Sequence, residues 1–141
     1  MKTLTIDYIN SLGPCYKAET VLPAEWTGTV IDVMNLKIKF EDRLWVVMRT
    51  DLVSEKLMRL FAVWCARQVP QSDGRSLKAL EVAEAFANGL ATAEELSAAE
   101  SAARSAARSA AWSAAESAAE SAQEVKLMEM LVAGIETGDV L

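Results

Sequence analysis

Histidine is absent from this chain of 141 residues. Its absence excludes histidine-based general acid–base catalysis, Ser–His and Cys–His nucleophile pairs, and nearly every catalytic zinc site. The six glycines are scattered and form no glycine-rich phosphate loop. Asp42 beside Arg43 and Asp51 near Arg49 could serve as acids, but solvated helix ends are the simpler interpretation. We therefore predict that the protein is not an enzyme and has no catalytic residue, cofactor or metal site.

Cysteine is also scarce, because Cys15 and Cys65 are the only two. Two thiols far apart in sequence make neither a disulfide framework nor a metal site, so reduced, partly buried thiols are expected and any redox role stays open. No uncharged run exceeds nine residues, whereas a membrane span needs about 20 apolar residues. Asp7 lies where a signal peptide would carry its apolar stretch. The sequence predicts a cytoplasmic protein without a membrane partner.

Basic residues are too few in the C-terminal part to balance the acidic ones. The first 91 residues hold 11 basic and 11 acidic side chains, so the net charge of −6 lies entirely beyond them. A general nucleic-acid binder needs a basic footprint. Nucleic acid is therefore not an expected partner.

The fold class predicted is all-α, with a helical body over residues 1–91. Apolar residues recur at helical spacing over 6–12, 29–36, 40–48, between Ser54 and Pro70, and over 76–87. Ser54 is the expected N-cap of its helix, and Pro70 ends it. The alternation at 36–40 leaves a short strand open there. Three tryptophans are expected in the core rather than as a ligand platform: Trp26, Trp45 and Trp64.

Glycine and proline are both missing from residues 90–133. Thr92 and Glu95 form a capping-box pattern at the start of this stretch, and alanine, the best helix former, dominates it. Residues 92–133 are therefore predicted to form one long Ala/Ser-rich helix of roughly 63 Å, with 134–141 as a tail. A compact chain of this length has a radius of gyration of about 14 Å. The helix must protrude, lie along a partner or pair with another copy, and we expect a homo-oligomer.

Seven tetrads of the form Ser-Ala-Ala-X, the last reading SAQE, occupy residues 97–124. Four residues advance a helix by about 400°, so the X residues spiral and cannot form a long coiled-coil seam. Trp112 interrupts the small side chains and is a typical interface anchor; Arg108 can lie on it. We predict partner contacts for Trp112, Arg104 and Arg108. Whether the repeat is functional or a tolerated expansion stays open.

Two further surfaces follow from the pattern. Beyond the tetrads, an apolar face is expected to pack on the body or on a second copy; it comprises Val125, Leu127, Met128, Leu131 and Val132. Arg59 and Arg67 share one helix face, with Arg43 and Arg49 one helix earlier. They are the best candidates for a basic groove that binds a partner or a small nucleotide. Ion pairing with the acidic helix is the alternative.

Four segments together resemble a known family: LGPCY at 12–16, DRLWVVMR at 42–49, RLFAVWCAR at 59–67 and SLKALEVAEAFANGLATAEEL at 76–96. This set, followed by an alanine tract, resembles small alanine-rich proteins carried by bacteriophages and prophages, some of which are labelled immunity proteins. The resemblance implies an accessory phage protein that acts on a host or competing factor. The expected function is non-enzymatic binding and occlusion of a bacterial protein, for example a defence component. An acidic nucleic-acid mimic and a small-nucleotide binder are the alternatives.

Overall fold

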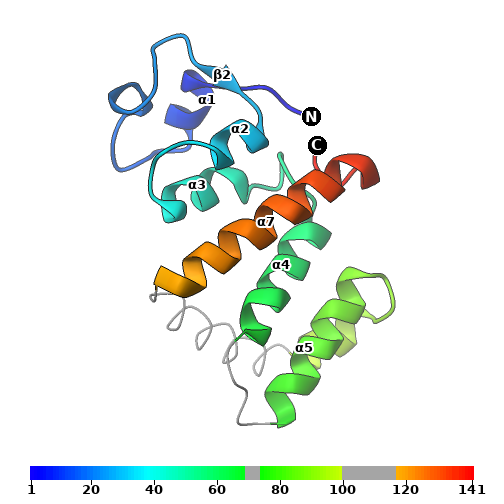
Figure 1. Ribbon diagram of the computed structural model, residues 1–141. Helices are drawn as coiled ribbons and strands as arrows, with labels where there is room; N and C mark the ends of the chain where they lie inside the picture. Colours follow the sequence, from blue (N-terminus) through cyan, green and yellow to red (C-terminus); the bar gives the residue numbers. More distant parts are fainter. Residues whose placement is uncertain (69–73, 100–116) are drawn as a thin grey trace. The chain divides into compact units, whose positions relative to one another are not determined.

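The computed structural model describes residues 1–68, 74–99 and 117–141 (Figure 1). The described chain is largely helical, as predicted, and carries one small two-stranded sheet. It divides into two compact units. Unit 1 comprises Met1–Ser54 and Leu131–Leu141, and unit 2 comprises Glu55–Met130. No helix among the described residues is both long and apolar enough to cross a membrane.

Unit 1 contains short helices and the sheet. The helices are α1 (Ile6–Ser11), the 3-10 helix η1 (Ala18–Thr20), α2 (Val30–Met34) and α3 (Phe40–Val47). Strands β1 (Leu4–Thr5) and β2 (Thr27–Gly28) pair antiparallel, with Leu4 opposite Gly28. The all-α expectation is therefore wrong in this detail, because strands of two residues are too short to leave an alternating pattern. No strand forms at 36–40, where irregular chain leads into α3.

Side-chain caps fix where the first helices of unit 1 begin. Thr5 accepts a hydrogen bond from the Tyr8 amide at the start of α1. Thr29 and Asp32 form a capping box at α2, in which Asp32 accepts from the Thr29 amide at 2.7 Å. Each cap satisfies an amide that has no partner inside the helix. The sequence therefore places the starts of these helices locally.

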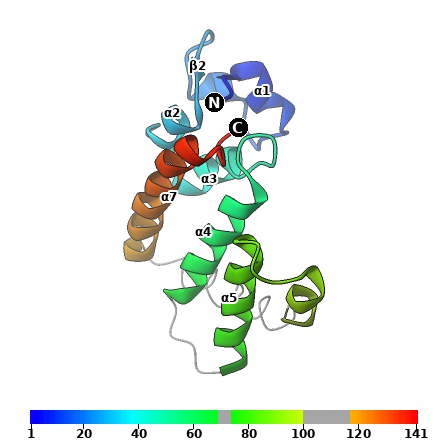
Figure 2. The same cartoon turned by 90° about the vertical axis from the view of Figure 1, so that its right-hand side faces the viewer.

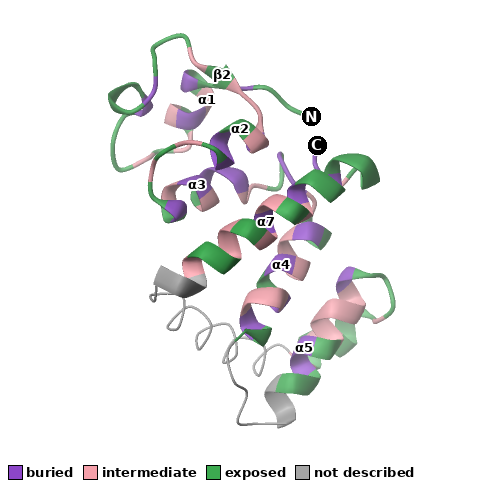
Figure 3. Ribbon diagram, viewed as in Figure 1, coloured by how far each residue is buried: buried purple, intermediate pink, exposed green. Residues whose placement is uncertain are grey.

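The C-terminal residues belong to the packed structure of unit 1, although a tail was expected. The amide of Lys2 donates to the Leu141 carbonyl at 2.7 Å, and the Leu141 amide donates to the Leu52 carbonyl at 2.8 Å. The Ser54 hydroxyl donates to Asp139 Oδ1 at 2.7 Å. The first residues of unit 1 and residues 52–54 thus bind the C-terminal residues. Unit 1 also contains fully buried side chains. These include Leu4, Val30, Val33, Val47, Leu52 and Val53 (Figure 3).

Unit 2 contains an antiparallel helical hairpin of α4 (Glu55–Arg67) and α5 (Gly74–Ala87), which lie side by side in both views (Figures 1 and 2). Val63 and Ala66 of α4 are buried with Leu80 of α5, and Ala83 packs against them. Helix α4 begins directly after Ser54, as predicted. Beyond α5, residues 93–99 are helical. The capping box at their start is confirmed, because the Glu95 amide donates to Thr92 Oγ1 at 3.2 Å.

A long C-terminal helix is present as α7 (Ser117–Thr137). The prediction of one continuous helix from 92 to 133 includes residues 100–116, which lie outside the described residues, so it stays a prediction. Helix α7 ends four residues later than expected, because Gly134 remains helical and Gly138 adopts the left-handed conformation at φ +80°. A left-handed glycine just past the last turn is a common helix end.

The apolar face of α7 is narrower than expected. Leu127 and Leu131 have no exposed surface, whereas Val125 is 62% exposed and Val132 is 52% exposed. Four-residue spacing puts the two leucines on one side of the helix. Within the described residues, the side of α7 that carries Leu127 and Leu131 is therefore buried, and Val125 and Val132 stay exposed.

Candidate functional site

Unit 1 contains an apolar pocket of about 320 Å³, which we call the unit 1 pocket. Residues from α1, the chain after it, α2 and α3 enclose it. Its lining residues are Ile9, Gly13, Pro14, Cys15, Tyr16, Ala18, Val21, Leu22, Val33, Leu36, Ile38, Glu41, Asp42, Trp45 and Val46. A concave, mostly apolar site with a few polar groups is the usual form of a binding pocket.

The side chains of Asn10 and Tyr16 fasten the largely irregular wall of the pocket, residues 13–22, through three hydrogen bonds. At one end, the Asn10 side chain accepts from the Ala18 amide and donates to Glu19 Oε1, each at 3.0 Å. Across the pocket, the Tyr16 hydroxyl donates to Asp42 Oδ2 at 2.7 Å. This hydrogen bond raises the pKa of Tyr16. The wall is therefore held to α1 and to the first turn of α3.

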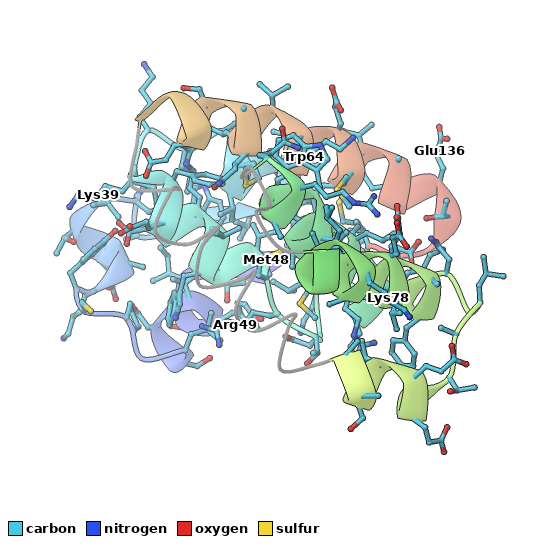
Figure 4. All side chains as sticks on the ribbon, turned by 90° about the horizontal axis from the view of Figure 1, so that it is seen from below. Lys39, Met48, Arg49, Trp64, Lys78 and Glu136 are labelled. Atoms are coloured by element: carbon cyan, nitrogen blue, oxygen red, sulfur yellow. The ribbon has the colours of Figure 1, made fainter. Side chains whose placement is uncertain are left out.

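Exposed aromatic and aliphatic side chains lie at the edge of the pocket. Tyr16 and Trp45 are each 39% exposed, and Val21 is 46% exposed. The expectation that Trp45 belongs to the core is therefore wrong, while Trp26 and Trp64 are half-buried. The guanidinium of Arg49, four residues further on, lies 4.4 Å from the centre of the Trp45 ring, and its Nε donates to the Trp45 backbone carbonyl. Arg49 is labelled in Figure 4. A cation–π contact with a guanidinium stabilises a tryptophan ring at the surface, so the ring need not be buried in the core.

The pocket is not predictable from the pattern of any one segment. Its lining comes from positions between 9 and 46 that belong to separate elements. One signal was available, namely the pair of Trp45 and Arg49 four residues apart, because a solvated guanidinium stacks on a ring at the surface. The alternation of apolar residues at Leu36 and Ile38 was a second signal. This segment forms no strand, and both side chains line the pocket.

The two cysteines differ in their surroundings. Cys15 is exposed at the pocket, whereas Cys65 is half-buried in α4. Burial raises the pKa of the Cys65 thiol to about 11. No group of three or more Cys, Asp or Glu that could hold a metal ion occurs in the part of the chain that the structure describes.

A second polar cluster in unit 1 joins Lys2, Tyr8 and Asp51. Lys2 Nζ is 2.6 Å from Asp51 Oδ2, and the Tyr8 hydroxyl donates to the same oxygen at 2.9 Å. The Lys2 contact holds the pKa of Asp51 below its ordinary value. Burial and the Asp51 hydrogen bond raise the pKa of Tyr8 to about 12. Lys2 and Tyr8 thus both bind the Asp51 carboxylate, so the cluster holds the N-terminal residues to the chain near Asp51.

The four arginines of the predicted basic groove belong to different units. Arg43 is buried in unit 1 and donates to the Met34 carbonyl at 2.6 Å, and Arg49 covers Trp45.

In unit 2, Arg59 lies 3.1 Å from Glu55 and stacks on Phe86 at 4.6 Å. Arg67 pairs with Glu84 at 2.6 Å. Carboxylates of the same hairpin thus offset both predicted site arginines.

Three other predicted contacts fall outside the described residues, namely Arg104, Arg108 and Trp112. They stay predictions.

The chain was compared with protein-family models, with curated proteins and with solved structures, and none of the three comparisons found a match.

Proposed function

We propose that this protein is a non-enzymatic accessory protein of bacteriophage or prophage origin that binds and occludes a bacterial protein inside the host cell. The unit 1 pocket would receive an apolar side chain of that partner. The observation that carries the proposal is the apolar lining of the pocket together with the exposed Tyr16, Val21 and Trp45 at its edge. Aromatic side chains around a pocket are typical centres of binding energy at interfaces. The resemblance to alanine-rich phage proteins favours a bacterial partner.

Binding of a small nucleotide by Arg59 and Arg67 receives less support. Each guanidinium already lies within ion-pair distance of a carboxylate of its own helical hairpin. A nucleotide phosphate would have to displace Glu55 or Glu84 before it gained a full charge-assisted contact.

Capture from a bacterial lysate with matched variants tests the proposal. We expect the full-length protein and Leu90→Ala to recover the same bacterial protein, because Leu90 is 81% exposed and is not a lining residue of the pocket. Trp45→Ala should weaken the capture by at least about tenfold, the effect of losing an aromatic anchor. Unchanged capture by Trp45→Ala, combined with its loss in Trp112→Ala, would move the contact to the Ser-Ala-Ala-X tract. A nucleotide retained by the purified protein would instead support the nucleotide-binding alternative.

A further inference from the structure

The charged groups in the unit 1 pocket are of one sign. Glu41 and Asp42, in the first turn of α3, both line it, and no lysine or arginine does. Lys17, Lys37 and Lys39 flank lining residues in the sequence, and all three are exposed. Lys39 precedes the first turn of α3 (Figure 4). An occupant of the pocket would thus touch apolar walls and two carboxylates.

Both carboxylates have acceptor capacity that the chain does not use. Asp42 accepts one hydrogen bond through Oδ2, from Tyr16. Glu41 is exposed, and the described residues supply it with no hydrogen-bond or ion-pair partner. An ionised carboxylate has about four acceptor positions in all. A cationic group beside the pocket would therefore gain contacts without breaking any that exist.

We infer that the unit 1 pocket selects a protein segment in which an apolar side chain, aromatic or branched aliphatic, stands next to a lysine or arginine. The apolar side chain fills the cavity, and its basic neighbour lies against Glu41 and Asp42. That the segment belongs to a captured partner rests on the proposed function; the selectivity rests on the lining alone.

The edge of the pocket favours a segment over a small free amine. Tyr16, Val21 and Trp45 leave large apolar side chains partly exposed around the opening. A free amine that fills a cavity of about 320 Å³ would leave this edge uncovered. The backbone and neighbouring side chains of a segment would cover it, and burial of apolar area adds binding energy.

The test uses three probes against the full-length protein at pH 7 and low salt, followed by amide chemical shifts. The probes are acetyl-Phe-Lys-amide, acetyl-Phe-Glu-amide and phenethylammonium. We expect shifts at pocket residues, with the Lys peptide binding about fivefold more tightly than the Glu peptide and about threefold more tightly than the amine. The Lys preference should shrink as salt is added, because exposed charges are screened.

Variants assign the selectivity to the two carboxylates. The double variant Glu41→Gln, Asp42→Asn keeps an acceptor for Tyr16, and its preference for the Lys peptide should fall below about twofold. The matched control Glu25→Gln alters an exposed carboxylate outside the lining and should keep the full preference. Near-ultraviolet circular dichroism checks that both variants are folded.

Three outcomes overturn the inference. Equal affinity for the Lys and Glu peptides removes the charge selectivity, and an amine that binds as tightly as the Lys peptide removes the preference for a segment. Absence of shifts at pocket residues with every probe at about 10 mM removes the site, since millimolar binding is visible there. If lysate capture fails while the Lys preference persists, the proposed function falls and the selectivity of the pocket stands.

Discussion

The phenol of Tyr16 donates a hydrogen bond of 2.7 Å to Asp42, 26 residues further along the chain. This contact joins the irregular wall of the unit 1 pocket to the first turn of α3, and both residues line the cavity. Since Tyr16 is also partly exposed, one side chain both holds the wall and forms the edge that a partner would meet.

Replacing Tyr16 by Phe should separate these two roles. The ring remains, while the hydrogen bond to a charged acceptor is lost. We expect the free energy of unfolding to fall by roughly 0.5–1.5 kcal/mol, the range of an ordinary hydrogen bond, because water competes for the carboxylate at this exposed position. Urea titration at pH 7 measures the change. A double-mutant cycle with Asp42→Ala, which removes the acceptor, isolates the pair, and strict additivity of the two changes would contradict the contact.

The two tyrosines of the chain should ionise late. Burial and the hydrogen bond to Asp51 raise the pKa of Tyr8 to about 12, and the hydrogen bond to Asp42 raises that of Tyr16. Both shifts favour the neutral phenol, so the stability they contribute is complete below pH 10 and is lost as the pH rises through the folded values. Phenolate absorbance should therefore appear at higher pH in the folded protein than in urea. Coincident titration curves would refute this.

Alkylation should distinguish the two cysteines. The pKa of Cys65 is raised to about 11 by burial, so at pH 8 only about one Cys65 thiol in a thousand is the reactive thiolate. Cys15 is exposed. Treatment with iodoacetamide should give one adduct quickly, at Cys15, and a second one far more slowly. Intact mass and peptide mapping follow both sites, and in Cys15→Ser only the slow reaction should remain.

The features of the fold that the sequence predicts correctly are local ones. The capping box of Thr92 and Glu95 and the start of α4 after Ser54 depend on residues within one helical turn, and both are found. The helical state of α4 and of α5 follows from apolar spacing within each segment, whereas their pairing as a hairpin was not predicted. The residues that stabilise each of these features lie close together in the sequence, so the sequence alone predicts them.

The features it missed depend on distant partners. Trp45 is expected in the core together with Trp26 and Trp64, but the residue is 39% exposed and Arg49 covers its ring. The C-terminal residues look like a tail, and become ordered because Lys2, Leu52 and Ser54 pair with them. The pocket needs residues from α1, α2 and α3 at once. Periodicity within a segment contains no information on these pairings.

Acid should weaken the fastening of the N-terminus. Asp51 has a lowered pKa because Lys2 and Tyr8 bind its ionised form. Its contribution to stability is therefore present above its ordinary pKa of 3.8 and is lost as the pH falls through the lowered value. Asp51→Asn should cost less than about 1 kcal/mol at pH 7, since the pair is solvent-exposed, and the difference from the wild type should vanish in stronger acid. Urea titrations over this range check it, with Glu25→Gln as the control; a constant difference would contradict it.

Truncation of two neighbouring side chains on α7 should change the free energy of unfolding by very different amounts. Leu131 has no exposed surface, whereas Val132 is 52% exposed. Leu131→Ala should lower the free energy of unfolding by about 2–5 kcal/mol, as replacement of a buried leucine by alanine does, while Val132→Ala should change it by less than about 0.5 kcal/mol in a monomer.

The predicted homo-oligomer gives Val132→Ala a second consequence. If another copy covers Val132, Val132→Ala should lower the molar mass measured by light scattering at micromolar concentration, with the helical content unchanged. A wild-type protein of monomer mass would refute the predicted assembly, and a costly Val132→Ala in such a monomer would refute the exposed position of Val132.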